Sequence, residues 1–191
     1  MVLAFRRARP EELTLLQDVM IAAFMEDPVF RWFDPAPAAR RRRLKRLFGH
    51  VLEKYLPKDT VWTDADRRAA AVWAPPGTPV TAGDVRFYLS LYANRLLKGI
   101  YWALFVETRR PRAPHYLLLY MGVAPEHQGA GLGGALLEEG LARADEEGVD
   151  AYLVASSPGS RRLYERHGFR VLREVRLARG PSVWPMLREA R

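Results

Sequence analysis

The fold of this chain is decided by the stretch Gly122-Val123-Ala124-Pro125-Glu126-His127-Gln128-Gly129-Ala130-Gly131-Leu132-Gly133-Gly134. It follows the nearly all-apolar run His115 to Val123, which predicts a strand buried on both faces at the centre of a sheet. It leads into a predicted helix from Gly129 to Glu147, whose apolar residues recur at helical spacing. Glycines leave backbone N–H groups open to a ligand, and the N-terminus of the helix adds partial positive charge. We therefore predict that this loop binds a pyrophosphate through its backbone.

A dinucleotide-binding fold is an alternative interpretation of the same loop, because Gly129, Gly131 and Gly134 satisfy Gly-x-Gly-x-x-Gly and Asp150 follows. Two observations count against it. The insert 125–128 separates the strand from the first glycine, and the chain after Asp150 is too short for the remaining strand and helix pairs. A turn needed only for packing would not require the four glycines found between positions 129 and 134.

The remaining pattern alternates strands and helices. Downstream of the loop we predict a strand at Ala151–Ala155, a short helix at Pro158–Arg166, and closing strands at Phe169–Leu177 and Val183–Leu187. Upstream we predict strands at Val2–Arg6, Thr60–Thr63 and Ala69–Ala74. We also predict a helix from Pro10 that Pro28 ends and a helix at Ala38–Lys54. The segment Ala82–Thr108 should form one kinked helix or two short ones, interrupted near Gly99. This order predicts an α+β fold. Its mixed, mostly antiparallel sheet should have two central parallel strands and be flanked by helices, in a single domain over 1–191.

Composition restricts the function. The chain has no cysteine, which excludes disulfides, thiolate metal sites and a cysteine nucleophile, and its four histidines are scattered, so we expect no metal. No apolar run is long enough to span a bilayer, so we expect no membrane partner and a cytoplasmic location. The net charge of +8 favours anionic partners. We interpret the run Arg40 to Arg43 as the solvated face of a helix, and we do not expect nucleic-acid binding.

Three residues of the loop, Gln128, Gly131 and Gly133, match a known signature: Gln or Arg-x-x-Gly-x-Gly or Ala, opening a helix after a buried strand. On this motif the chain resembles the GNAT acetyltransferases. The likeness continues through 151–157 and through Leu163-Tyr164-Glu165-Arg166-His167-Gly168-Phe169. It is similar to the puromycin N-acetyltransferase branch at 71–77 and 180–186, and the specific match covers about Tyr116 to Met186.

The resemblance implies a GNAT fold with splayed central strands, and acetyl-CoA as cosubstrate. It implies transfer of the acetyl group to a primary amine by direct attack in a ternary complex. The residues implied to bind acetyl-CoA are Met121, Gly122, Val123, Gln128, Gly129, Ala130, Gly131, Leu132, Gly133, Gly134 and Ser160. The N–H of Val123 would stabilise the oxyanion, and Tyr164 would protonate the departing thiolate. Relatives often carry Glu at the position of Val154 and Asn at those of Ser157 and Ser160.

The general base is left open among His115, Glu26, Asp27 and water. We assign Trp73, Trp102 and Trp184 to the core. Of Arg161, Arg162 and Arg166, at least one could reach the phosphates of the cosubstrate, the other two being expected on a solvated helix face.

The expected acceptor is a small-molecule amine, on the likeness to the antibiotic-modifying branch. A protein N-acetyltransferase and a catalytically inactive acyl-CoA-binding regulatory domain are the alternatives. A basic nucleic-acid-binding protein is a third class. The sequence leaves the oligomeric state open, with a homodimer as one option.

Overall fold

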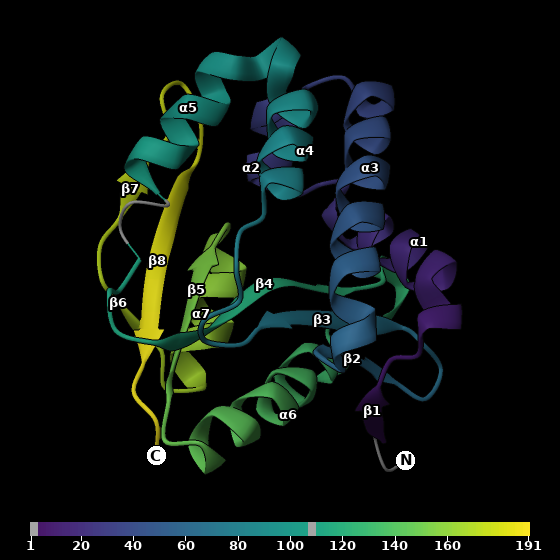
Figure 1. The fold of residues 1–191 in the computed structure, drawn as a ribbon, viewed down its shortest axis with the longest axis vertical. Helices are drawn as coiled ribbons and strands as arrows, with labels where there is room; N and C mark the ends of the chain where they lie inside the picture. The colour runs from purple at the N-terminus through teal and green to yellow at the C-terminus, as the bar shows by residue number, and fades with distance from the viewer. Residues whose placement is uncertain (1–3, 107–109) are drawn as a thin grey trace.

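The computed structural model describes residues 4–106 and 110–191 (Figure 1). One mixed sheet runs through it in the order β1-β2-β3-β4-β5-β8-β6, and β7 pairs with β8. The strands are β1 (Phe5–Arg7), β2 (Val61–Asp64), β3 (Ala69–Ala74), β4 (His115–Val123), β5 (Asp150–Ala155), β6 (Arg170–Val171), β7 (Val175–Arg176) and β8 (Ser182–Arg188). All pairings are antiparallel except that of β4 with β5. The predicted α+β class and mixed sheet are thereby confirmed.

The two parallel strands pair over only a short length. Their register joins His115 to Asp150 and Leu117 to Tyr152, and it stops there. Beyond this point β4 continues against β3 as far as Val123, and β5 continues against β8 as far as Ala155. The strands therefore diverge, as the family resemblance implied, and the sheet is open between them.

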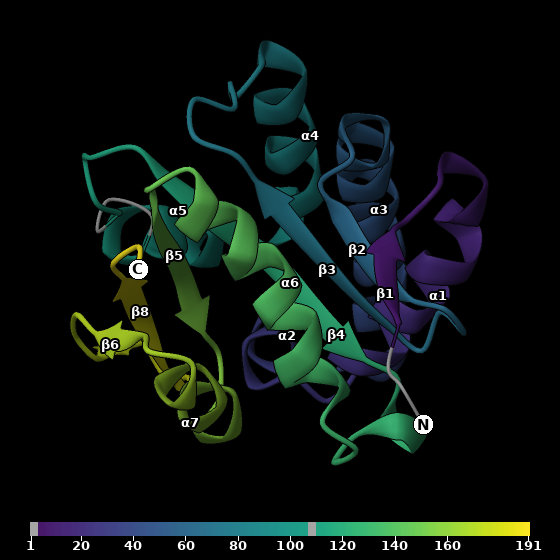
Figure 2. The ribbon, with the colours of Figure 1, turned by 90° about the horizontal axis from the view of Figure 1, so that it is seen from below.

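Helices cover both faces of the sheet (Figure 2). They are α1 (Leu13–Phe24), α2 (Pro28–Phe33), α3 (Pro37–Tyr55), α4 (Ala82–Tyr92), α5 (Leu96–Phe105), α6 (Leu132–Glu146) and α7 (Pro158–Arg166), with short 3-10 turns at Pro10–Glu12, Leu56–Lys58, Ala93–Arg95 and Pro125–His127. Strand β3 shows why two cores form. Alternate residues of a strand point to opposite faces, so Ala70 and Val72 pack with α1 and α3, whereas Ala71 and Trp73 pack with α6. Apolar side chains from both helical layers bury the central strands.

Several predicted boundaries were wrong, each for a local reason. Pro28 does not end the first helix. It begins α2, whose N-cap Asp27 accepts hydrogen bonds from the Val29 and Phe30 N–H groups. The helix after the glycine loop begins at Leu132 rather than Gly129, because Gly129 and Gly131 have left-handed φ angles of 81° and 82°.

Two further predicted elements are divided. The predicted helix over 82–108 is α4 and α5 joined at Ala93–Arg95 rather than broken near Gly99, and the predicted strand over 169–177 is β6 and β7. Of the predicted segments, residues 2–3 and 107–108 lie outside the described part of the chain.

We expected the arginine run to be the solvated face of a helix, but only part of it is exposed. Arg41 and Arg42 are exposed, but Arg40 and Arg43 are buried, with 3% and 7% exposure. Arg43 pairs with the buried Asp34 and donates to the Asn94 side chain at 2.8 Å. Arg40 donates to the Asp34 carbonyl at 2.8 Å. These bonds hold the end of α2 against α3, because a buried charge needs partners.

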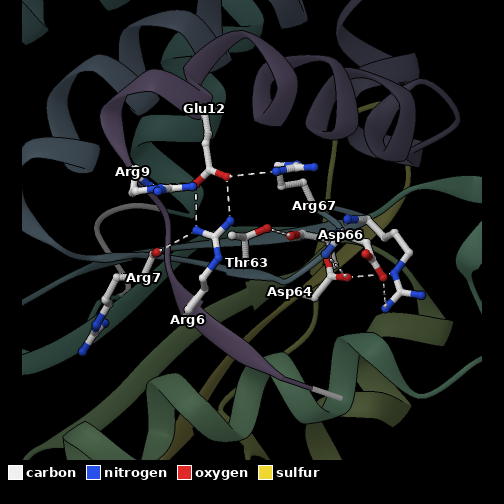
Figure 3. A network of polar contacts seen from close by, with 10 residues as sticks. Arg6, Arg7, Arg9, Glu12, Thr63, Asp64, Asp66 and Arg67 are labelled. Atoms are coloured by element: carbon white, nitrogen blue, oxygen red, sulfur yellow. Dashed lines mark hydrogen bonds and ion pairs between the residues drawn. The ribbon is translucent and has the colours of Figure 1, made fainter. Parts of the chain in front are cut away.

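A second polar network fastens the edge of the sheet (Figure 3). Glu12 follows β1 and is only 5% exposed. Its carboxylate accepts two hydrogen bonds from Arg6, at 2.8 and 2.6 Å, and lies 3.6 Å from Arg67 in the turn between β2 and β3. The Arg6 hydrogen bonds are the main cause that lowers the pKa of Glu12 from 4.5 to about 2.

We predict that Glu12→Gln lowers the free energy of unfolding at neutral pH by about 3 kcal/mol, the equivalent of the pKa shift. Because the pKa of Glu12 is lowered in the folded state, its contribution is complete above pH 4.5 and is lost as the pH falls towards 2. Urea unfolding across this range measures both effects. Glu11→Gln, at the exposed neighbour, is the control. Equal stability of the Glu12 variant and wild type at pH 7 would contradict the assignment.

Candidate functional site

A cavity of about 930 Å³ occupies the gap between the diverging strands. Its walls come from the ends of β4 and β5, the α1–α2 junction, the start of α7, the glycine loop, and residues of α4 and α5. The predicted cosubstrate-binding residues on its wall are Met121, Gly122, Val123, Gln128, Gly129, Gly131, Leu132, Gly133, Gly134 and Ser160. Ala130 belongs to the same loop and is exposed. The structure thus brings all the predicted residues except Ala130 to the wall of one cavity.

The glycine loop forms an open backbone cradle. A Cβ added at Gly129 or Gly131 would meet no protein atom within 4 Å, and both positions line the cavity. Gly131 is the N-cap of α6 and supplies no side-chain cap. The first N–H groups of a helix have no partner within the helix, and Ala135 is the first residue that donates back, to the Gly131 carbonyl. The backbone donors before it, at the positive end of the helix, can bind an anion.

The edge of β4 also presents backbone groups to the gap. The N–H of Ala124 donates to the Arg68 carbonyl on the β3 side. Alternation along the strand therefore turns the N–H and C=O of Met121 and Val123 towards the side from which β5 has diverged. The Gln128 side chain donates to the Val123 carbonyl at 3.0 Å, so it ties the loop to the strand end.

Gly122 has a packing role in addition to the predicted one. A Cβ at this position would lie 2.8 Å from the Ala23 Cβ and 3.2 Å from Phe24 and Met20 atoms. Helix α1 can therefore contact β4 closely only because residue 122 has no side chain. This contact sets the position of the α1–α2 junction beside the cavity.

Tyr164 lies in the cavity wall, on α7, and is 8% exposed. Its ring packs edge-on against Phe169, with 5.9 Å between ring centroids. Among the described residues, none forms a hydrogen bond with its hydroxyl, which can therefore donate to a ligand. Burial, followed by the charge of Asp27, raises its pKa above the usual value of 10.0. The hydroxyl therefore stays protonated at neutral pH.

Asp27 is a base candidate whose charge acts on Tyr164. It lines the cavity, and its Oδ1 accepts from the N–H groups of Val29 and Phe30 at 2.9 and 3.2 Å. Its Oδ2 accepts the hydroxyl of Ser156, which directly follows β5. Burial is the main cause that raises the pKa of Asp27, while these hydrogen bonds oppose the rise. A carboxylate oxygen has room for a further donor beside Ser156.

The other two base candidates are less suitably placed. His115 is not on the cavity wall, and lies at the end of β4 where the strands still pair, near the Ala113 carbonyl. Glu26 lines the cavity, but its side chain is 74% exposed and lies 3.4 and 3.5 Å from Arg31 and Arg40.

Ser160 and the arginines of α7 have structural partners. The Ser160 hydroxyl forms a capping box with Ser157, accepting from the Ser157 N–H at 3.1 Å and donating to its carbonyl at 3.0 Å. Arg161 pairs with Glu165 at 2.8 Å. Arg166 alone of the three arginines lines the cavity.

The sequence analysis missed an aromatic wall. Trp73 and Trp184 are buried as predicted, but Trp102 is half-exposed and lines the cavity, so its assignment to the core was wrong. Phe33 of α2 contacts both Trp102 and Tyr92, with centroid distances of 6.4 and 4.9 Å. The aromatic spacing in α2 could have indicated a helix, but only the tertiary fold brings its rings beside α4 and α5.

Over 4–106 and 110–191, no three His, Asp or Glu side chains converge in a way that could hold a metal ion. In the same ranges no helix combines the length and apolar character needed to cross a membrane.

Comparison with known proteins adds a family. The acetyltransferase (GNAT) domain family matches residues 93–190, which is more than half of the chain. The mycothiol acetyltransferases of Propionibacterium freudenreichii and Salinispora arenicola are 34% and 36% identical over 113 and 120 residues. These matches cover 57% and 59% of this chain but only 33% and 36% of the two relatives.

Solved structures share the fold along the whole chain. One, reported as histone acetyltransferase HPA2 and related acetyltransferase from Corynebacterium glutamicum, has a TM-score of 0.76 at 24% identity, covering 100% of this chain and 98% of its own. A mosquito arylalkylamine N-acetyltransferase-like protein has a TM-score of 0.67 at 16% identity, covering 98% and 100%. At such identities the likeness concerns the fold alone.

Proposed function

This chain belongs to the acetyltransferase (GNAT) domain family, and on that premise we propose that it transfers the acetyl group of acetyl-CoA to the primary amine of a small molecule. The observation that carries the proposal is the single cavity that joins the glycine loop, the unpaired edge of β4, Tyr164 and Asp27. The glycine loop, as an anion-binding cradle, and the proposed acid and base therefore line one space.

The residues present fit acetyl-CoA. The open Cβ directions at Gly129 and Gly131 leave room for a pyrophosphate against the N-terminus of α6. The backbone groups of Met121 and Val123 face the gap and can hydrogen-bond an extended amide-bearing arm, as a neighbouring strand would. Arg166 is placed to add a charge-assisted contact to a phosphate. When bound, acetyl-CoA supplies the acetyl group as a thioester.

The transfer then needs three protein functions. An acceptor that binds as an ammonium group first loses one proton to the general base, which leaves a nucleophilic amine. The amine nitrogen then forms a bond to the carbonyl carbon, the carbon–sulfur bond breaks, and a second proton leaves the nitrogen as the departing thiolate gains one. We assign stabilisation of the developing oxyanion to the Val123 N–H, and donation to the sulfur to Tyr164. The pKa of Tyr164 is raised above 10.0, and the thiol formed by protonating the thiolate has a pKa of about 8.5. Full proton transfer from Tyr164 to the thiolate is therefore uphill by more than about 2 kcal/mol. Hydrogen-bond donation is therefore its main contribution.

We assign the general base to Asp27. Its oxygens are held by α2 and Ser156, so the carboxylate has a fixed orientation towards the cavity. Its raised pKa brings it closer to that of an amine substrate than an ordinary carboxylate would be. Water relays and the other two candidates remain alternatives that the variants below distinguish.

Finer features of the proposal rest on resemblance. A small-molecule acceptor is supported by relatives and fold neighbours named for mycothiol, agmatine and arylalkylamines. Membership of the puromycin branch, a cytoplasmic location and a homodimer stay predictions. Release of CoA distinguishes the two alternatives from this proposal. A regulatory domain releases no CoA with any amine, and a protein N-acetyltransferase releases CoA only with a polypeptide acceptor.

We predict that acetyl-CoA raises the melting temperature, since a ligand of the folded state adds about 2.7 kcal/mol at a hundredfold excess over Kd, and that NAD does not. Gly131→Val should abolish the acetyl-CoA shift, because its branched side chain enters the cradle at a left-handed φ. Gly148→Val is the matched control, with φ of 64° and equally open space, but outside the cavity wall. A shift with NAD alone would replace this proposal by the dinucleotide interpretation.

Tyr164→Phe should lower kcat by roughly 10²-fold or more while acetyl-CoA affinity and the melting temperature change little, because only the donor is removed. The control is Tyr116→Phe, which removes a buried hydroxyl bonded to Glu147 at 2.7 Å, away from the cavity. That variant should lose about 1 kcal/mol of stability and keep its turnover. Single-turnover rates and thermal melts on the same samples separate catalysis from packing. Wild-type turnover in Tyr164→Phe would remove the assignment.

Asp27→Asn should lower kcat/KM by roughly 10²-fold or more, because Asn preserves the helix cap but cannot accept the substrate proton. In the wild type, kcat/KM should fall as the pH drops through the pKa of Asp27. Because burial raises this pKa above 3.8, the acidic limb of the pH profile should lie above the usual carboxylate range. The variant should lose this limb. If Glu26→Gln or His115→Gln removes it instead, the base has been assigned to the wrong residue.

A further inference from the structure

The end of the cavity remote from the glycine loop is lined mainly by rings from separate elements. We call it the acceptor end, and it is formed by residues of α1, α2, α4, α5 and the adjoining part of β4. Phe24 contacts Phe30 and Tyr120, with centroid distances of 5.6 and 5.9 Å. Phe33 contacts Tyr92 and Trp102. Such a wall favours an apolar or aromatic body over a polyol, whose hydroxyls need many polar partners.

The acceptor end has few charged side chains, and its two acids differ in whether they face solvent or the cavity. Among the described wall residues, Glu26 and Asp27 are the acids and Arg110 is the base at the acceptor end. Glu26 points to solvent and lies within ion-pair distance of Arg31 and Arg40. Within the part of the wall that the structure describes, Asp27 therefore supplies the one inward-facing carboxylate, and its charge adds to burial in raising the pKa of Tyr164.

We propose that the acceptor is a primary amine that carries a single positive charge on an apolar, preferably aryl, body, and that Phe33, Tyr92 and Trp102 select this body. This inference rests on the proposed acetyl transfer. The ammonium group lies at Asp27, and the body packs on the rings, which bury apolar surface. Of the wall residues described, no second carboxylate faces inward to pair with a second ammonium group, which would be desolvated among these rings.

Matched amines test the charge rule in the wild-type protein. Hexylamine and hexamethylenediamine have the same chain and differ by the second ammonium group. We expect kcat/KM, measured as release of free CoA thiol, to be at least about tenfold higher for hexylamine, the discrimination that one unpaired polar group produces. Phenethylamine should be accepted at least as well as hexylamine. Equal or better use of the diamine overturns the inference and leaves the proposed acetyl transfer standing.

Variants of Trp102 test the aromatic wall. Trp102→Ala should raise KM for phenethylamine about tenfold with little change in kcat, because it removes binding surface and not a reacting group. Trp102→Phe should restore most of the affinity. The control is Leu97→Ala on the solvent side of the same helix, where the side chain is 83% exposed, and its kcat/KM should equal that of wild type. An unchanged KM in Trp102→Ala contradicts the selecting role.

The proposed acetyl transfer and the proposed acceptor class are contradicted by different results. If acetyl-CoA binds but none of these amines or larger acceptors releases CoA, the proposed transfer is wrong, and this inference is wrong with it. If diamines or polyols are the preferred acceptors, the transfer is supported and the acceptor class is wrong.

Discussion

The divergence of β4 from β5 is the constraint on which the rest of the structure depends. The strands pair from His115 to Leu117 and from Asp150 to Tyr152, and each then follows a different antiparallel neighbour. Buried backbone donors and acceptors without partners are costly, so an open sheet centre is stable only where water or a ligand can satisfy its edge. The bulge in β4 opposite Val72 and Trp73 lies at the start of this opening. The interruption of the sheet there leaves the backbone edge that our proposal assigns to the cosubstrate.

Two glycines near the opening act in opposite ways. At Gly122 the space that a side chain would take is occupied by Ala23, because helix α1 packs directly against the strand. At Gly131 the missing side chain leaves open space, and the positive φ turns the backbone at the start of α6. The first glycine thus positions Asp27 through the end of α1, and the second leaves the cradle free. Both walls of the cavity depend on the absence of a Cβ.

Local patterns predicted much of the fold, because they depend on neighbours in sequence. The apolar run of β4, the bounds of α7 and the glycine loop follow from periodicity and backbone chemistry. Long-range contacts could not be predicted this way. Nothing near Arg40 and Arg43 in sequence shows that Asp34 and Asn94 will surround them, and Trp102 faces the cavity only because α5 packs on α2. Asp27 was one of three side-chain candidates for the base, besides water, and nothing near it in sequence shows that the hydroxyl of Ser156, which follows β5, donates to it.

The proposed acid and base are coupled through space, and the coupling favours the order of steps. Burial is the main cause that raises the pKa of Tyr164, and while Asp27 is ionised its charge raises this pKa further and weakens the hydroxyl as a donor. When the carboxylate takes the proton of the attacking amine, that charge is removed and the pKa of Tyr164 moves back towards its ordinary value. Tyr164 therefore becomes the stronger donor at the stage when the thiolate leaves. Because Tyr164 is buried and Asp27 is half-buried, water screens this interaction less than at the surface. One half-buried charge can thus delay assistance to the leaving group until the nucleophile has lost its proton.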